Sequence, residues 1–249
     1  MNSYKLAKYN IKSSLKSIII FYCIFIAVII AIALMNRFSG VYGYTSGMES
    51  SSIIFLFVLG LNSFKENFYF SQANNICRVD YFKSLVITIL PISLCMASID
   101  VIINRVYNIF FSNPTIYDLV YNNYQSKGSS IKSWVQNNSI QSLVGTDTFL
   151  FTFYIFAFAI GLLITMIFYK CNKTMKILIF LSPMVIQAIF ASVIYNFPKF
   201  GEKSASFIYN ILGISTKNSY ICVLTFICLF IIMMCFVYII VRRVVIKKA

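Results

Sequence analysis

Six long apolar segments constrain this chain more than any other feature of its sequence. The clearest runs from Ile18 to Met35 without a charged residue, and the others cover about residues 53–70, 85–111, 149–169, 177–195 and 220–241. Each is close to the length that an α-helix needs to cross roughly 30 Å of hydrocarbon. Solid apolar runs, rather than alternating ones, argue against the strands of a membrane barrel. We therefore predict an all-α polytopic membrane protein with six transmembrane helices.

Composition supports a chain that lipid surrounds. Hydrophobic residues make up 59% of the 249 residues and charged residues only 11%, which is too much apolar surface for one soluble core. The formal net charge is +14, but the chain has no polar domain of useful size on which basic residues could form a nucleic-acid surface. We predict a membrane-lipid partner and no nucleic-acid partner.

Four lysines stand at helical spacing before the first apolar run: Lys5, Lys8, Lys12 and Lys16. Tyr4, Ala7, Ile11 and Leu15 follow a neighbouring stripe of the same helix. This pattern predicts that residues 1–17 form a basic amphipathic helix on the inner membrane surface, turning directly into the first span. A cleaved secretory signal and an ordinary cytoplasmic tail are the alternatives, but the 18-residue apolar run is long for a signal sequence.

The distribution of basic residues predicts the orientation of the spans. With both termini inside, the inner segments hold 14 of the 21 Lys and Arg residues and the remainder holds 7. The positive-inside rule therefore favours an even number of spans with both termini cytoplasmic. We predict one membrane domain over residues 1–249, in which the polar stretch 112–147, with the sole tryptophan Trp134, caps the outer surface.

The inner loop after the second span, residues 64–84, is aromatic and charged together. Six rings surround Lys65, Glu66, Arg78, Asp80 and Lys83, although an ordinary linker would be polar. Aromatic side chains beside arginine are favoured in the cores of protein interfaces. The loop therefore predicts a surface that docks a cytoplasmic partner, unless its rings simply lie at the membrane interface.

Two patterns in this loop resemble the permease subunits of ABC-2 type transporters, particularly the short six-span permeases of Gram-positive bacteria. These are Phe-x-Glu-x-Phe-x-Phe at residues 64–70 and Asn-x-x-Arg-x-x-Tyr-Phe-x-Ser at residues 75–84. Many family members carry glycine and serine around the arginine, where this chain has Ile76 and Cys77. The resemblance implies that residues 1–17 are an elbow helix and that the loop supplies the coupling helix that contacts the ATPase. The implied docking residues are Phe64, Glu66, Phe68, Phe70, Arg78, Asp80, Tyr81 and Phe82.

The function implied by the resemblance is export of a hydrophobic or amphipathic substrate, such as a peptide, lipid or drug, in antimicrobial peptide resistance or a related role. The chain has no phosphate-binding Gly-x-x-x-x-Gly-Lys-[Ser/Thr] loop, so ATP would be hydrolysed by cytoplasmic ABC ATPase subunits. The implied partners also include a second permease subunit, as a homodimer or heterodimer, in a bacterial plasma membrane. The alternative is a membrane accessory, immunity or sensor protein without transport.

The third apolar segment contains four polar side chains: Asp100, Asn104, Arg105 and Asn108. Three of them recur at every fourth residue and so share one face of a helix. Charged side chains in a span usually face protein or a watery cavity. They predict either the polar lining of a transport path or the point where the helix reaches the outer interface.

Catalytic and metal chemistry have little support in this sequence. Histidine is absent, and the seven cysteines include no Cys-x-x-Cys pair, so neither a zinc site nor a histidine-based catalytic site is expected. We predict a non-enzymatic transport subunit without a metal or cofactor. The lone glycines Gly60 and Gly161 could permit close helix contact, but neither belongs to a Gly-xxx-Gly pair.

Overall fold

The computed structural model describes residues 3–39, 46–121 and 136–244. Within these ranges all regular structure is helical. The long helices are α1 (Ser3–Ser39), α4 (Arg78–Asn108), α6 (Ile140–Lys170), α7 (Lys173–Asn196) and α9 (Ser219–Arg243), and the shorter ones are α2 (Ser50–Asn62), α3 (Lys65–Ala73), α5 (Ile116–Val120) and α8 (Pro198–Ile211). Six helical segments are long and apolar enough to cross a membrane, which confirms the prediction of an all-α multi-pass membrane protein.

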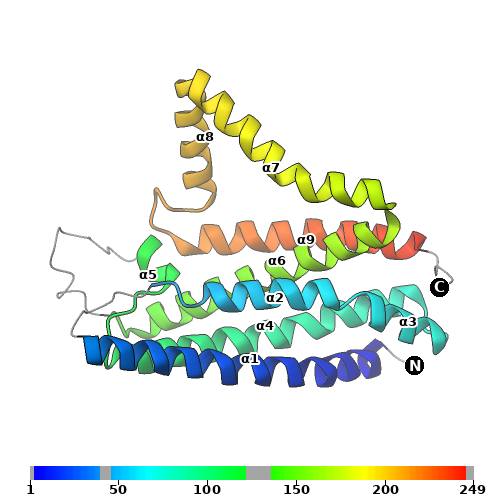
Figure 1. Cartoon of the computed structure of the whole chain (residues 1–249), viewed down its shortest axis with the longest axis horizontal. Coiled ribbons are helices and arrows are strands. Elements are labelled where there is room, and N and C mark those ends of the chain that lie inside the picture. Colours follow the sequence, from blue (N-terminus) through cyan, green and yellow to red (C-terminus); the bar gives the residue numbers. More distant parts are fainter. Residues whose placement is uncertain (1–2, 40–45, 122–135, 245–249) are drawn as a thin grey trace.

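Helices α1, α2, α4, α6 and α9 run roughly side by side, whereas α7 slants away from them, and successive spanning segments alternate in direction (Figure 1). The first turn of α1 and the last turn of α9 lie at the same end of the molecule, as an even number of spans requires. We call this lysine-rich end the inner end, following the positive-inside rule. Trp134 of the predicted outer cap, and Lys247 and Lys248 of the predicted inner side, lie outside the described residues.

The lysine-rich segment and the first apolar run form one helix, because α1 is continuous over 37 residues. A separate helix over residues 1–17 does not form. The physical reason is local, since residues 3–39 contain neither proline nor glycine to interrupt the hydrogen-bond ladder. At about 1.5 Å per residue, α1 extends roughly 55 Å and is longer than the hydrocarbon layer is thick.

The start of α1 packs on protein as well as facing outward. Leu6, Ala7 and Asn10 are buried, and the Thr88 hydroxyl donates to the Ala7 carbonyl at 3.5 Å. Tyr4 and Leu15, which share the predicted apolar stripe with Ala7, are exposed. The four lysines are all exposed, so they are not the residues by which the start of α1 packs on protein.

The second apolar segment is two helices rather than one. α2 ends at Asn62 and α3 begins at Lys65, with Ser63 and Phe64 between them. Alone, the 13 residues of α2 would extend only about 20 Å. The second span is therefore completed at the inner end by α3.

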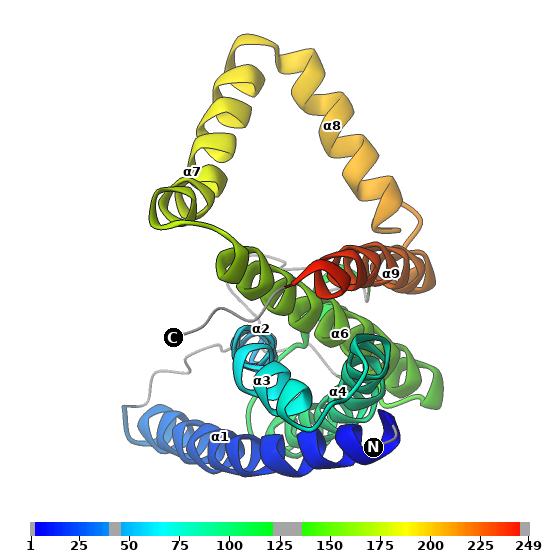
Figure 2. The same ribbon diagram turned by 90° about the vertical axis from the view of Figure 1, so that its right-hand side faces the viewer.

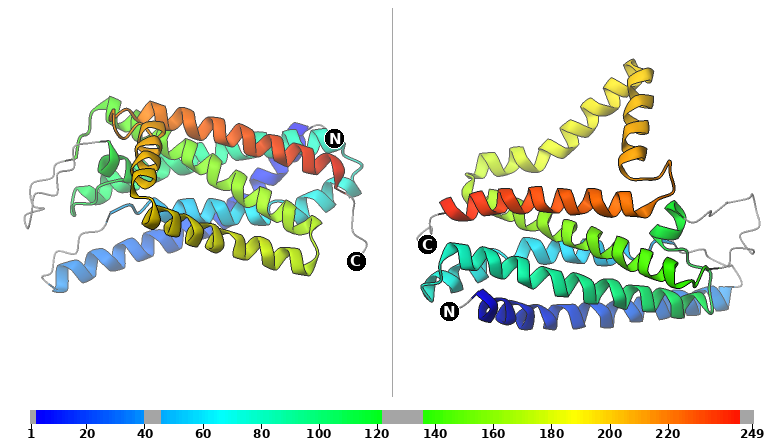
Figure 3. Two further views of the ribbon diagram at one scale, coloured as in Figure 1. Left: turned by 90° about the horizontal axis from the view of Figure 1, so that it is seen from above. Right: turned by 180° about the vertical axis from the view of Figure 1, so that it is seen from behind.

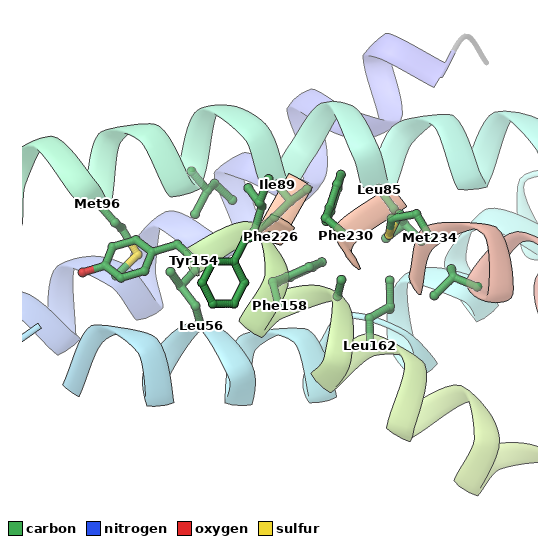
Figure 4. Packing of buried hydrophobic residues seen from close by; sticks show 14 of the residues in the cluster. Leu56, Leu85, Ile89, Met96, Tyr154, Phe158, Leu162, Phe226, Phe230 and Met234 are labelled. Carbon is green, nitrogen blue, oxygen red and sulfur yellow. The ribbon is translucent and has the colours of Figure 1, made fainter. Parts of the chain in front are cut away.

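α6 lies at the centre of the bundle and packs against α2, α4 and α9. Figure 4 shows Tyr154, Phe158 and Leu162 of α6 among side chains from these neighbours. Phe158 and Leu162 are almost fully buried. The hydrophobic core of the described residues is thus organised around one helix.

Gly60 of α2 and Gly161 of α6 mark the place where these two helices touch. A Cβ atom added to Gly60 would lie 2.3 Å from the Phe158 carbonyl oxygen, and one added to Gly161 would lie 2.2 Å from the Phe57 carbonyl oxygen. Both distances are far below van der Waals contact. The two isolated glycines act as a pair across the interface, a relation that is invisible in sequence because they lie 101 positions apart.

α7 and α8 form a hairpin that stands away from the bundle (Figures 2 and 3). The most apolar part of α7 contains no buried residue, and none of the residues of α8 is buried. α8 was not predicted from the sequence. Its signal is Pro198 in the first helical position followed by segregated polar and apolar faces.

Candidate functional site

The inner end is built around α3 and the sharp turn that follows it. Glu66 stands in the first turn of α3, where a carboxylate is favoured by the helix dipole. The helix ends at Ala73, Asn75 adopts a positive φ of 53°, and the Ile76 amide donates to the Ser71 carbonyl at 2.9 Å. The chain therefore reverses within a few residues and begins α4 at Arg78.

Three rings form the interior of this inner end. Phe64, Phe68 and Tyr81 are 0–1% exposed. The ring centroids of Phe64 and Phe68 lie 5.1 Å apart, and those of Phe68 and Tyr81 lie 5.4 Å apart. These are ordinary distances for favourable aromatic pairs. The three rings fix α3 against the beginning of α4.

Further contacts join α3 to two other spanning helices. The Tyr9 ring of α1 stacks on Phe70 at 4.6 Å. The hydroxyls of Tyr69 and Tyr169, the latter on α6, lie 3.0 Å apart. Phe64 also meets the Tyr169 ring edge to face at 5.4 Å. α3 is therefore held by α1 and α6 as well as by α4.

The start of α4 is tied in turn to the end of α9. Arg78 Nη1 donates to the Arg242 carbonyl oxygen at 2.6 Å, which satisfies one of the unpaired carbonyls at a helix C-terminus. The Phe82 and Tyr238 rings pack edge to face at 5.1 Å. Tyr9, Tyr169, Tyr238 and Arg242 were not singled out from the sequence. Their only signal there is an aromatic or basic residue near the inner end of a span.

The residues predicted to dock a partner differ in their burial. Phe64, Phe68 and Tyr81 are buried within this chain, so they cannot be contact residues for a partner in this conformation. Phe70, Phe82 and Arg78 are half-buried and already engaged inside the molecule. An aromatic residue in a polar loop has the same sequence signature whether it packs inward or outward, and a docking role for the half-buried residues stays a prediction.

What remains accessible at the inner end is mainly polar. Glu66 is exposed and Asp80 is half-buried, and both keep their predicted place at the inner surface. Lys65, Asn74, Cys77 and Lys83 are exposed beside them. We call the exposed set Lys65, Glu66, Asn74, Cys77 and Lys83 the inner platform.

Asp100 lies in the bundle interior and is 3% exposed. The Tyr22 hydroxyl of α1 donates to Asp100 Oδ1 at 3.0 Å, and the Tyr154 hydroxyl of α6 donates to Asp100 Oδ2. Tyr22 also lies 3.1 Å from the Met96 carbonyl oxygen. A carboxyl group that accepts bonds from two neighbouring helices joins α1, α4 and α6 at one point.

The other three polar residues of α4 hold the outer segments. Asn104 Nδ2 and Asn108 Nδ2 donate to the Asn113 carbonyl oxygen at 3.1 and 2.9 Å. Arg105 Nη1 donates to Asn138 Oδ1 at 3.1 Å. Gln136 Nε2 donates to Asn104 Oδ1 at 2.8 Å. These side chains attach the segment before α5 and the segment before α6 to α4.

Glu49 precedes α2 at the same outer end and was not identified from the sequence. It is 2% exposed. Burial raises the pKa of Glu49 to about 7, the backbone N–H groups of Glu49 and Ile116 oppose this rise, and the nearby carboxyls of Asp100 and Asp118 add to it. A lone acidic residue before a helix is ordinary in sequence, so only its burial makes it notable.

The four residues predicted to line a path all lie on α4, but they are in two different environments. Asp100 is enclosed by three helices, whereas Asn104, Arg105 and Asn108 bind the outer segments. Their polar groups face protein, which is the arrangement expected for such residues in a span. Whether they line a transport path remains a proposal.

Chemistry at either end is limited by the residue types present. Among the described residues, no three Cys, Asp or Glu side chains gather closely enough to hold a metal ion. All seven cysteines are free thiols. The inner end thus offers a rigid charged surface, and the outer end offers a network of hydrogen bonds.

Comparisons with protein-family models, with curated protein sequences and with solved structures gave no match to this chain.

Proposed function

We propose that this protein is the permease subunit of an ABC-2 type exporter in a bacterial plasma membrane. In this proposal, cytoplasmic ATPase subunits dock on the inner platform and hydrolyse the ATP. The substrate is hydrophobic or amphipathic, and a second permease subunit completes the transporter. That subunit would lie against α7, whose apolar side chains have no buried contacts within this chain.

One observation carries the proposal: α3 contacts three spanning helices at once while presenting charged side chains outward. Its rings pack on α1, α4 and α6, and Arg78, at the start of α4, extends the connection to α9. Packed side chains couple the movements of the helices that they join, because such contacts change between discrete arrangements rather than deforming continuously. A force applied to the inner platform would therefore reach four spanning helices.

The division of roles follows from burial. Lys65 and Glu66 would contact the ATPase, because they are exposed. Phe68 and Tyr81 would transmit the displacement, because they are buried between α3 and α4. ATP-driven approach of two ATPases would then tilt the helices and change access from the inner to the outer side.

The test is co-expression of the tagged chain with each ATPase encoded beside its gene, followed by purification and measurement of ATP hydrolysis. We expect co-purification, and we expect Glu66→Arg to weaken it at least about tenfold, since a reversed contact charge is repulsive. Lys176→Glu is the matched control, because Lys176 is an exposed charge at the inner end of α7.

Phe68→Ala separates docking from coupling. We expect this variant to bind the ATPase normally but to lose ATP-dependent export, because the cavity breaks the connection from α3 to α4. The proposal is wrong if no ATPase associates, or if Glu66→Arg and Lys176→Glu behave alike in both binding and export.

A further inference from the structure

An apolar groove runs between α1 and α4. Figure 2 shows α1 on the side of the bundle opposite the α7–α8 hairpin. Seven residues of α1 from Ile11 to Ile26 and five residues of α4 from Pro91 to Ile99 line it. Its volume is about 420 Å³, within the range of small-molecule sites. No charged residue lines the groove.

Two contacts join the helices along the groove. The Thr88 hydroxyl lies 3.5 Å from the Ala7 carbonyl oxygen toward the inner end, and the Tyr22 hydroxyl lies 3.1 Å from the Met96 carbonyl oxygen and 3.0 Å from Asp100 Oδ1 further out. The lining begins beyond the inner contact and continues past the outer one, to Ile26 on α1 and Ile99 on α4.

The length of the groove along α1 corresponds to the thickness of one leaflet of a membrane. The rise from Ile11 to Ile26 is about 22 Å along α1, while half of a bilayer with its headgroups measures roughly 20 to 22 Å. The groove begins within the lysine-rich part of α1 and continues into its apolar part. Its occupant would thus extend from the inner surface toward the middle of the bilayer.

The lysines lie on the same side of α1 as the groove. Lys8, Lys12 and Lys16 each precede by seven residues, or about two turns, a residue that lines the groove: Leu15, Ile19 and Cys23 respectively. Residues seven apart share a helix face. The lysines are exposed, and the first 48 residues contain no acidic side chain to neutralise them.

From this juxtaposition we infer that the groove binds a phospholipid of the inner leaflet that has an anionic headgroup. One acyl chain lies in the groove between α1 and α4, and the phosphate lies near Lys12 and Lys16. Charge complementarity selects this occupant, because an apolar groove alone would accept any hydrocarbon. The site goes beyond the proposed transport function and does not depend on an ATPase.

The experiment measures lipid binding to the purified full chain in mild detergent, by native mass spectrometry and by thermal stabilisation. The probes are phosphatidylglycerol, which is anionic, and phosphatidylcholine, which has no net charge. We expect phosphatidylglycerol to bind more tightly. The double variant Lys12→Gln with Lys16→Gln should weaken its binding roughly twenty- to thirtyfold, at about fivefold for each lysine near the surface.

Two controls separate this site from general charge and general hydrophobicity. Lys170→Gln with Lys176→Gln removes two exposed charges elsewhere at the inner end and should leave binding unchanged. Cys95→Trp fills the groove and should abolish tight binding, whereas Cys228→Trp, at an exposed position of α9, should not.

Three results would overturn the inference. The two lipids could bind equally, or the two lysine pairs could weaken binding equally, which would show attraction to the whole inner end. Alternatively, the wild type could be a dimer that Cys95→Trp dissociates, which would make a second copy of the chain the occupant.

Discussion

α6 and α7 are consecutive spanning helices of the same mean hydropathy, yet they end in opposite environments. More than half of the most apolar part of α6 is buried within the chain, whereas none of the corresponding part of α7 is. Only Cys171 and Asn172 separate them. Figure 3 shows α6 inside the bundle and α7 leaving it.

The difference teaches that apolarity decides whether a helix enters the membrane but not what it packs against. Lipid tails are as apolar as a leucine side chain, so exposure to lipid carries little penalty. What distinguishes α6 is shape: Gly161 admits α2, and large side chains such as Phe158 fill the spaces between helices. α7 has no comparable contact.

The largest expected effect comes from removing a large side chain in each helix. Phe158→Ala in α6 should lower the free energy of unfolding by about 3–5 kcal/mol, because it leaves a cavity in a packed core. Phe190→Ala in α7 should change it by less than about 1 kcal/mol, since Phe190 is 45% exposed. Unfolding in mixed micelles with increasing SDS would measure both. Equal losses would mean that α7 is packed as tightly as α6.

The pH dependence of the free energy of unfolding should show that Glu49 is buried at the outer end of the bundle. An unfolded Glu49 titrates near 4.5 and the folded one near 7, so the folded state favours the protonated form. The stabilisation of the folded state by the proton on Glu49 is fully present below pH 4.5 and is lost as the pH rises through 7. At about 1.4 kcal/mol per pKa unit, Glu49→Gln should raise the free energy of unfolding at pH 8 by about 3 kcal/mol.

The matched control for this titration is Glu202→Gln, because Glu202 is exposed on α8. Its unfolding free energy should follow the wild-type pH profile. A Glu49→Gln variant with the same profile as the wild type would show that water reaches the Glu49 carboxyl group.

Glycine substitutions give the smallest expected effect. Gly161→Ala should destabilise the protein by about 1–3 kcal/mol, because the added methyl group meets the Phe57 backbone and forces α2 and α6 apart. For Gly201→Ala in the hairpin, the three nearest atoms to the added Cβ all belong to the Ile194 side chain, with Cγ2 at 2.9 Å. This variant should cost less than about 1 kcal/mol, because the contact involves no backbone of a neighbouring bundle helix and alanine has the higher helix propensity. Thermal unfolding of both variants in detergent measures the two changes in stability. A similar loss at Gly201 would contradict the loose packing of the hairpin.

The helices themselves were predictable because their signals are local. Each predicted span lies within or overlaps a helical segment, although α4 begins at Arg78 rather than near Leu85 and α6 at Ile140 rather than near Phe149. The extra turns are polar, because a helix continues through the headgroup region until a cap or turn ends it. Ser139 provides such a cap for α6 by accepting from the Ser142 amide at 3.2 Å.

The candidate site was predictable only in part. The charged and aromatic loop drew attention to the inner end, and the repeat of Asp100, Asn104 and Asn108 drew attention to one face of α4, whose polar groups bind protein in the structure. The docking surface and the transport path themselves stay predictions. The direction of Phe64, Phe68 and Tyr81 was not predictable, because it depends on Tyr169 and on the turn at Asn75. The direction of a side chain at a helix junction depends on the backbone turn and on contacts with distant helices, which the local sequence does not specify.

By itself the sequence determined that this protein is an all-α chain with six apolar segments of spanning length and a lysine-rich inner end. Only the tertiary structure decided that α6 is central, that Gly60 meets Gly161, and that the rings of the inner loop point inward. It also placed the lysines of α1 in line with an apolar groove. The physical reason is that hydropathy and charge act on local sequence, whereas lipid and protein interior are nearly equal as apolar surroundings. Packing between distant segments therefore makes the final choice.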